Sequence, residues 1–172
     1  FNYTCDPILN EDETYKYSDS RVFIRNNTLL GSSSGINLLK YVNGLVIESN
    51  YIESTTYCIS TSVYSEDYMI KNNTLSMVGT VGNCINGQGE LNRATIEGNI
   101  FDTKNLGANL TLLGTNWIKF INNTFINPNS YGIRLANQEG IVYHLGNSFT
   151  NTTKKVTITG TTEVKSIVSD EL

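Results

Sequence analysis

Asp102, Lys104 and Arg134 are the residues whose types and spacing could support catalysis. A polysaccharide lyase needs a base near a sugar α-proton and a cation on the uronate, and this trio contains one carboxylate and two cations. Glycoside hydrolysis instead needs two carboxylates about 5 to 9.5 Å apart, one of them with a raised pKa. Solvated polar residues on a loop are the favoured interpretation of the trio. The sequence leaves open whether the protein is an enzyme.

The cysteines and the single histidine do not form a pattern typical of a metal site. Cys5, Cys58 and Cys84 are an odd number without the paired spacing of zinc ligands, so we expect neither a metal nor a cofactor. Cys58 and Cys84 occupy equivalent places in adjacent repeats, where a disulfide or two stacked free thiols would fit. His144 falls at an inward-facing position, whereas its apolar neighbours fit the opposite register. We therefore expect the last repeat to be irregular, and a catalytic role for His144 is the minor alternative.

The elements that must position these residues recur at a nearly constant interval. Each repeat has an alternating apolar stretch that ends in an asparagine, as in Val22-Phe-Ile-Arg-Asn-Asn27. The anchor asparagines, separated by 23, 23, 26, 24 and 24 residues, are Asn27, Asn50, Asn73, Asn99, Asn123 and Asn147. This period, with strand-type alternation, predicts an all-β protein, a parallel β-helix (solenoid) of about six coils of 23–26 residues.

Each coil is expected to contain three short strands and one asparagine corner. A Gly-Ile-x-Leu segment forms the first strand, a Val-x-Ile segment the second, and the apolar residue after the asparagine the third. We expect each anchor asparagine to adopt left-handed backbone angles and to join an amide ladder between coils, which makes these residues structural. The predicted division is residues 1–20 as a cap or linker, 21–158 as the β-helix, and 159–172 as a cap or exiting strand.

Composition excludes some partners. The chain has 172 residues, a net charge of −4 and a pI near 5.0, which disfavours nucleic acid as a partner. Its apolar runs are a few residues long, against the roughly 20 needed to span a bilayer, so membrane insertion is not expected. Two prolines, 14 glycines and ten tyrosines are typical of a turn-rich β protein.

Acceptor motifs for N-glycosylation, Asn-x-Ser/Thr, occur six times. They begin at Asn2, Asn26, Asn72, Asn109, Asn122 and Asn151. In a chain this rich in asparagine and threonine chance supplies several such motifs, and some lie in the predicted corners. The sequence alone therefore does not predict glycosylation.

The pattern Gly-Ile-x-Leu followed by x-x-Ile-x-x-Asn-x-Ile/Phe resembles the right-handed, single-stranded parallel β-helix repeat of the pectate-lyase-like superfamily and of phage tailspikes and appendages. The resemblance covers roughly residues 20 to 158. In enzymes of that superfamily the groove lies over the outer face of the first strand. The resemblance thus implies a carbohydrate-binding strip formed by Asn37, Ser60, Asn86, Thr111, Arg134 and Tyr131.

Two outward-facing columns are predicted on the second strand. One has alternating charges and should form a surface ladder of ion pairs: Arg25, Glu48, Lys71 and Glu97. The other begins with three apolar residues: Phe23, Val46, Met69, Thr95, Lys119 and Tyr143. This column indicates either a covered face, as in the homotrimers of the tailspikes it resembles, or ordinary surface scatter.

The leading hypothesis is a β-helix module of a phage tailspike or appendage, or of a bacterial surface protein, that binds and in an intact trimer could cleave cell-surface polysaccharide. A stand-alone polysaccharide lyase or hydrolase is the first alternative, and a non-catalytic structural spacer or adhesin is the second. The expected location is the virion tail or the extracellular surface of a cell.

Overall fold

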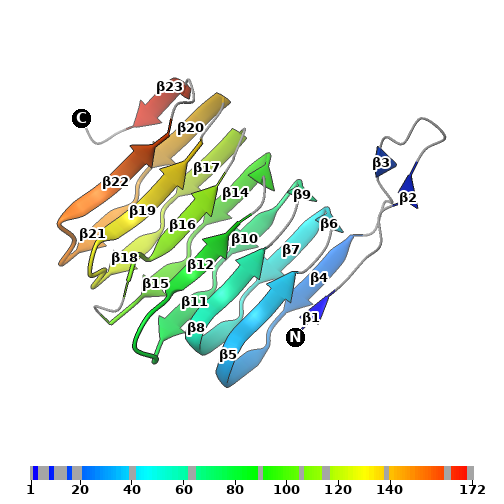
Figure 1. The fold of residues 1–172 in the computed structure, drawn as a ribbon, viewed down its shortest axis with the longest axis horizontal. Coiled ribbons are helices and arrows are strands. Elements are labelled where there is room, and N and C mark those ends of the chain that lie inside the picture. Colours follow the sequence, from blue (N-terminus) through cyan, green and yellow to red (C-terminus); the bar gives the residue numbers. More distant parts are fainter. Residues whose placement is uncertain are drawn as a thin grey trace.

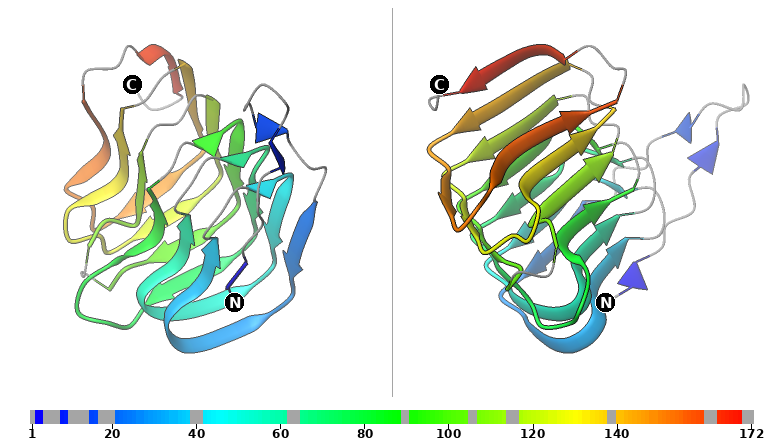
Figure 2. Two further views of the ribbon diagram at one scale, coloured as in Figure 1. Left: turned by 45° about the vertical axis from the view of Figure 1, so that its right-hand side comes forward. Right: turned by 60° about the vertical axis from the view of Figure 1, so that its left-hand side comes forward.

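The computed structural model describes residues 2–3, 8–9, 15–16, 21–38, 42–61, 65–88, 91–104, 107–113, 117–137, 140–160 and 164–169. Every regular element within these ranges is a β-strand. The strands of successive coils lie side by side along one axis, and the chain advances from one end of the stack to the other (Figures 1 and 2). The predicted all-β parallel solenoid is confirmed.

One wall of the solenoid is a seven-stranded parallel sheet built from the Val-x-Ile segments. Its strands, in spatial order, are β4 (Val22–Arg25), β7 (Leu45–Glu48), β10 (Met69–Lys71), β14 (Ala94–Glu97), β17 (Trp117–Ile121), β20 (Gly140–Leu145) and β23 (Val164–Ser169). Each pairs in parallel with the equivalent strand of the next coil. The register shifts once, between Gly140 and Ile141 where β20 meets β23.

The remaining walls form one continuous eleven-stranded sheet. Its strands are β1 (Asn2–Tyr3), β5 (Thr28–Leu38), β8 (Tyr51–Thr61), β11 (Thr74–Met77), β12 (Asn83–Gly87), β15 (Ile100–Asp102), β16 (Leu110–Leu113), β18 (Thr124–Ile126), β19 (Tyr131–Ala136), β21 (Ser148–Thr150) and β22 (Lys154–Thr159). The expected third strand and the next first strand are merged in β5 and β8. They separate in later coils, and in the last three of these Lys104, Asn127 and Asn151 adopt left-handed angles at the turn.

Two smaller sheets complete the described elements. The strands β6 (Val42–Asn43), β9 (Ser65–Glu66) and β13 (Leu91–Asn92) pair in parallel beside the seven-stranded sheet. β2 (Ile8–Leu9) and β3 (Tyr15–Lys16) form an antiparallel pair. The division into 1–20, 21–158 and 159–172 remains a prediction, although β22 crosses residue 158 and β23 adds a parallel strand beyond it.

The bore is filled by columns of apolar residues in exact-register parallel pairs. One column contains Ile24, Ile47, Ile70, Ile96 and Phe120, and a second contains Leu29, Ile52, Leu75, Phe101, Phe125 and Phe149. In the second column the rings of Phe101, Phe125 and Phe149 stack with centroids 4.9 Å apart. This spacing matches the strand separation of about 4.8 Å, so each ring packs on the ring of the neighbouring coil.

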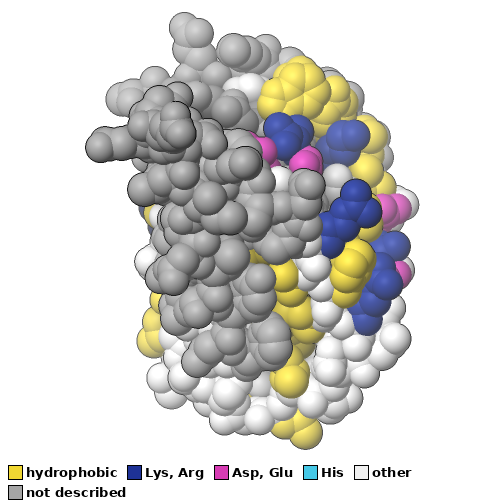
Figure 3. Space-filling view, turned by 90° about the vertical axis from the view of Figure 1, so that its right-hand side faces the viewer, with side chains coloured by type: hydrophobic (Ala, Val, Ile, Leu, Met, Phe, Trp, Pro, Cys, Tyr) yellow, Lys and Arg dark blue, Asp and Glu magenta, His cyan; other side chains and the backbone are white. Residues whose placement is uncertain are grey.

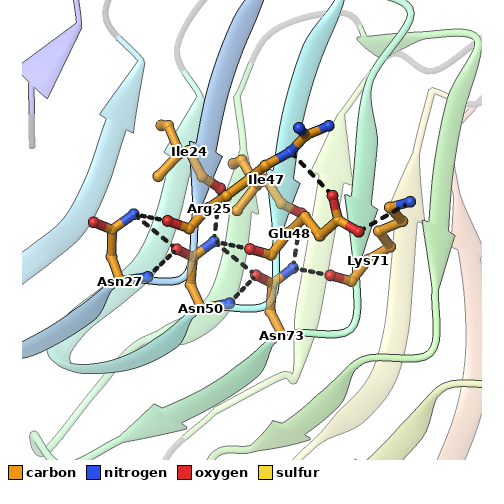
Figure 4. Close-up of polar contacts among 8 residues, drawn as sticks. All are labelled: Ile24, Arg25, Asn27, Ile47, Glu48, Asn50, Lys71 and Asn73. Atoms are coloured by element: carbon orange, nitrogen blue, oxygen red, sulfur yellow. Dashed lines mark hydrogen bonds and ion pairs between the residues drawn. The ribbon is translucent and has the colours of Figure 1, made fainter.

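The anchor asparagines form an unbroken amide ladder over five full turns, from Asn27 to Asn147. Each Nδ2 donates a hydrogen bond of 2.9–3.0 Å to the Oδ1 of the asparagine in the next coil. The same Oδ1 accepts the backbone N–H of the previous asparagine, and Nδ2 also donates to a carbonyl of the seven-stranded sheet, as from Asn50 to Ile24 and from Asn73 to Ile47 (Figure 4). The ladder therefore ties each corner to both neighbouring coils.

The expectation that the anchor asparagines adopt left-handed angles is wrong. The positive φ angles, from 52° to 63°, belong to the preceding residues, which are Asn26, Ser49, Asn72, Gly98, Asn122 and Gly146. An asparagine whose amide must point inward to the ladder cannot also make the sharp backbone reversal, so the residue before it does. This explains why small or amide residues precede every anchor.

The predicted charge ladder is centred on Glu48. Its Oε2 lies 3.0 Å from Arg25 Nε and its Oε1 lies 3.1 Å from Lys71 Nζ (Figure 4). Because these side chains are partly exposed, each pair contributes about 0.2–1 kcal/mol.

Candidate binding cleft

The predicted carbohydrate strip is one column of paired residues but is unevenly exposed. Asn37, Ser60, Asn86, Thr111 and Arg134 follow one another in register. Asn86 is 7% exposed and Thr111 is 9% exposed, whereas Arg134 at one end is exposed. The covered centre leaves little surface for a polymer to contact.

The exposed end of this strip carries an aromatic and two cations. The Tyr131 ring lies 5.9 Å from the Arg134 guanidinium carbon and 5.2 Å from Lys154 Nζ. These contacts are cation–π interactions that occupy the ring rather than leave its face open. A sugar would have to displace one of the cations to stack there.

The predicted catalytic trio is only partly brought together. The Asp102 carboxylate accepts a hydrogen bond of 2.9 Å from the backbone N–H of Lys104, which holds the turn between β15 and β16. Among the residues that the structure describes, no ion pair joins Asp102, Lys104 and Arg134. A turn-stabilising carboxylate accounts for this geometry, and the catalytic assignment remains a prediction.

The structure shows a different cleft at the N-terminal ends of β14 and β17 in the seven-stranded sheet. We call it the Arg93–Trp117 cleft. It consists of two adjoining depressions of about 180 and 450 Å³ that share Arg93 and Trp117. Its lining is completed by Glu66, Asn92, Ala94, Thr95, Ile118, Lys119 and Tyr143. On the face that contains it, hydrophobic side chains lie beside basic and acidic ones (Figure 3).

Arg93 is positioned at this cleft by two carboxylates. Its Nε donates to Asp67 Oδ1 at 2.7 Å, and its Nη2 donates to Glu66 Oε2 at 2.8 Å and to Asp67 Oδ2 at 3.1 Å. Asp67 and Arg93 are equivalent corner residues of adjacent coils, both with φ of 55°, so the stacking of the coils places them in contact. Nη1 makes no hydrogen bond within the described part of the chain, which leaves its donors for a ligand.

Two further side chains at the cleft are Trp117, which is half exposed, and Asn92, whose amide oxygen has no hydrogen-bond donor among the described residues. The Trp117 side chain is 49% exposed although it lies on a strand, directly beyond Arg93 in the next coil. Asn92 Oδ1 is buried and has no hydrogen-bond donor among the described residues. A buried acceptor without a donor costs about 1–3 kcal/mol.

Sequence reasoning did not identify Arg93, Asn92 or Trp117. One signal was available, because Trp117 is the only tryptophan and alternates with the buried residues Ile118 and Phe120, which places it outside the bore. Arg93 carried no comparable signal. Its pairing with Asp67, 26 residues earlier, depends on the length of the intervening coil.

The ion pair of Asp67 predicts an acid-dependent contribution to stability. The hydrogen bond from Arg93, with the charge of Arg93, lowers the pKa of Asp67 from its ordinary value of 3.8. A lowered folded-state pKa stabilises the fold above the unfolded-state value, and this stabilisation is lost as the pH falls through the folded-state pKa. We expect Asp67→Asn to reduce the free energy of unfolding near neutral pH, and the difference from wild type to shrink as the pH falls below the ordinary pKa of Asp67. Denaturant titrations of both proteins across pH 2 to 7 measure this; an unchanged difference at acid pH contradicts it.

Cys58, Cys84, Met77 and His144 lie inside the bore. Cys58 and Cys84 are free and fully buried, with Cys58 Sγ 3.8 Å from Met77 Sδ. Burial, and then the neighbouring Cys58 thiol, raise the pKa of Cys84, which keeps this thiol neutral. His144 is 4% exposed and stacks on Phe149 with ring centroids 5.5 Å apart. β20 pairs in regular register with β17 from Ile141 to Leu145, and the expected irregularity lies on its other side, where the register with β23 shifts between Gly140 and Ile141.

These features define a parallel β-helix protein with a polar and aromatic cleft on its outer surface. The model of the NosD family, described as periplasmic copper-binding protein (NosD), matches residues 9–165, so the chain belongs to this family. No curated protein and no solved structure matches the chain. Membership agrees with the expected β-helix and with a location outside the cytoplasm.

The described residues do not fit the copper named in the family description. They contain no group of three or more His, Cys, Asp or Glu residues that could hold a metal ion. Cys58, Met77 and Cys84 have the soft sulfur atoms that suit Cu(I), but they are fully buried and the thiol of Cys84 is held neutral, whereas metal binding requires a thiolate. In the described ranges no helix is long and apolar enough to cross a membrane.

Proposed function

We propose that this chain is a β-helix module of a cell-surface or extracellular protein that binds polysaccharide at the Arg93–Trp117 cleft. The observation that carries the proposal is a half-exposed tryptophan beside an arginine fixed by two carboxylates. A tryptophan face packs on the apolar face of a sugar ring, while a fixed guanidinium hydrogen-bonds its hydroxyls.

The surroundings of the cleft favour a linear polymer. Thr95, Lys119 and Tyr143 line it, and the same outward column continues through Met69 and Val46 to Phe23 in earlier coils. Neighbouring members lie about 4.8 Å apart, so the column could contact successive sugar residues. Phe23, at the far end, is 52% exposed. A polymer lying along the solenoid would cover the apolar residues of this column.

Binding is favoured over hydrolysis at this cleft. A glycosidase acid needs a raised pKa, but Arg93 lowers the pKa of Asp67. The phage tailspike origin, the homotrimer, the strip from Asn37 to Arg134 and the catalytic role of Asp102 remain alternatives. Activity in a reducing-sugar or unsaturated-uronate assay would favour the enzyme alternative. A trimeric mass by light scattering would favour the tailspike alternative.

Trp117→Ala is expected to weaken polysaccharide binding at least tenfold, because it removes the stacking platform while leaving the strand pairing intact. The measurement is affinity electrophoresis and a glycan array with wild type and variant. Val81→Ala, which truncates an exposed side chain outside the cleft, is the matched control and should bind as wild type does. Thr111→Ala tests the predicted strip in the same assay. Equal binding by wild type and Trp117→Ala, or loss only in Thr111→Ala, contradicts the cleft as the site.

A further inference from the structure

The asparagine corner has a second regular feature on its outer side. The left-handed residues before the anchors alternate along the axis: Asn26, Ser49, Asn72, Gly98, Asn122 and Gly146. Every second coil thus presents an asparagine, with a serine or glycine between. In each of these coils the next two residues are asparagine and threonine, which completes Asn-x-Thr.

The structure separates these three motifs from the motif at Asn109, while the exposed Asn151 already donates its Nδ2 to Asn127 Oδ1 at 2.8 Å. Asn26, Asn72 and Asn122 are exposed, and their Nδ2 atoms have no hydrogen-bond partner among the described residues. Asn109, by contrast, is fully buried, and its Nδ2 donates to the carbonyls of Phe101 and Ile126. The chain therefore carries an internal comparison between motifs with accessible and inaccessible amides.

The neighbouring coils leave room for a bulky group on each exposed amide. Acceptors two coils apart are separated by about 9.6 Å, twice the strand spacing. At the equivalent position of the intervening coil, Ser49 lies between Asn26 and Asn72, and Gly98 lies between Asn72 and Asn122. A Cβ at Gly98 would collide with Asn72 Oδ1, and one at Gly146 would collide with Asn122 Oδ1, so each amide oxygen rests on the backbone of the next coil. At Asn72 and Asn122 the amide oxygen, rather than Nδ2, therefore faces the next coil.

We propose that Asn26, Asn72 and Asn122 are N-glycosylation sites that form a single row along one ridge of the solenoid. In the transfer, Nδ2 forms a bond to the anomeric carbon of a lipid-phosphate-activated oligosaccharide. The bond between that carbon and the phosphate breaks, Nδ2 loses one proton, and the lipid phosphate leaves. The row lies at the opposite end of β4, β10 and β17 from the Arg93–Trp117 cleft, so the glycans would leave the cleft open.

The test is secretion of the whole chain from eukaryotic cells that contain an oligosaccharyltransferase. Site occupancy is measured by peptide mass spectrometry after enzymatic deglycosylation in ¹⁸O-water. Secreted, folded protein is expected to carry glycan at Asn26, Asn72 and Asn122 and none at Asn109. Thr28→Ala, Thr74→Ala and Thr124→Ala should each remove one glycan and spare the other two, while Thr74→Ser should retain it.

Two results overturn the proposal. One is secreted protein with the three exposed sites empty, or with Asn109 occupied while the fold is intact by circular dichroism. The other is a chain that is secreted only when all three threonines are replaced, because this would show that glycans at the ridge prevent folding. Neither result depends on polysaccharide binding, so the proposed function is tested separately.

Discussion

Replacing Asn73 by leucine is expected to lower the free energy of unfolding by at least about 3 kcal/mol. Asn73 Nδ2 donates to Asn99 Oδ1, Ile47 O and Lys71 O, and its Oδ1 accepts from both the backbone N–H and Nδ2 of Asn50. Leucine fills a similar volume but makes none of these bonds. The buried groups left without partners cost about 1–3 kcal/mol each, which is why the effect exceeds that of an average substitution.

Two asparagines serve as controls for this substitution. Asn27 ends the ladder and is exposed, so Asn27→Leu should cost less than half as much as Asn73→Leu. Asn129 is exposed outside the ladder, and Asn129→Leu should remain within about 0.5 kcal/mol of wild type. Denaturant unfolding followed by circular dichroism measures all three. Folded Asn73→Leu should keep wild-type affinity for polysaccharide, and similar losses in the three variants would show that the ladder does not stabilise the corners.

Phe125→Ala is expected to cost about 3–5 kcal/mol, because it removes the middle ring of the aromatic stack. Phe125 is fully buried, with the rings of Phe101 and Phe149 each 4.9 Å away. The neighbouring coils are held at the strand spacing by hydrogen bonds, so they cannot collapse into the cavity. Thermal and denaturant unfolding give the size of the loss.

Phe23→Ala is the matched control, since it removes the same side chain from an exposed position on β4. It should change the free energy of unfolding by less than about 1 kcal/mol. A loss in Phe125→Ala no larger than that in Phe23→Ala would show that the ring column is not a main source of stability.

Much of the architecture could be predicted because it depends on local pattern. Alternation around Ile24, Ile47 and Ile70 places one face of each strand in the bore, and the constant interval between asparagines brings those faces into register. The asparagine corner was predicted, but the left-handed turn was assigned to the anchor asparagine instead of to the residue before it. Both residues of pairs such as Asn72-Asn73 tolerate left-handed angles, so only the packed structure shows which of them turns the chain and which points inward.

The cleft was not predicted because its parts come from different coils. Asp67 reaches Arg93, and Arg93 lies next to Trp117, only when three coils stack with their corners aligned. The strip from Asn37 to Arg134 was placed correctly as a column, but the cover over Asn86 and Thr111 is a property of the folded surface.

The sequence by itself determined the period, the inward columns and the existence of an asparagine corner, because hydrophobic alternation and backbone preference act within a few residues. The tertiary structure decided which outward side chains are accessible and which charges meet. Those properties arise between coils, where residues more than twenty positions apart become neighbours at the spacing of paired strands.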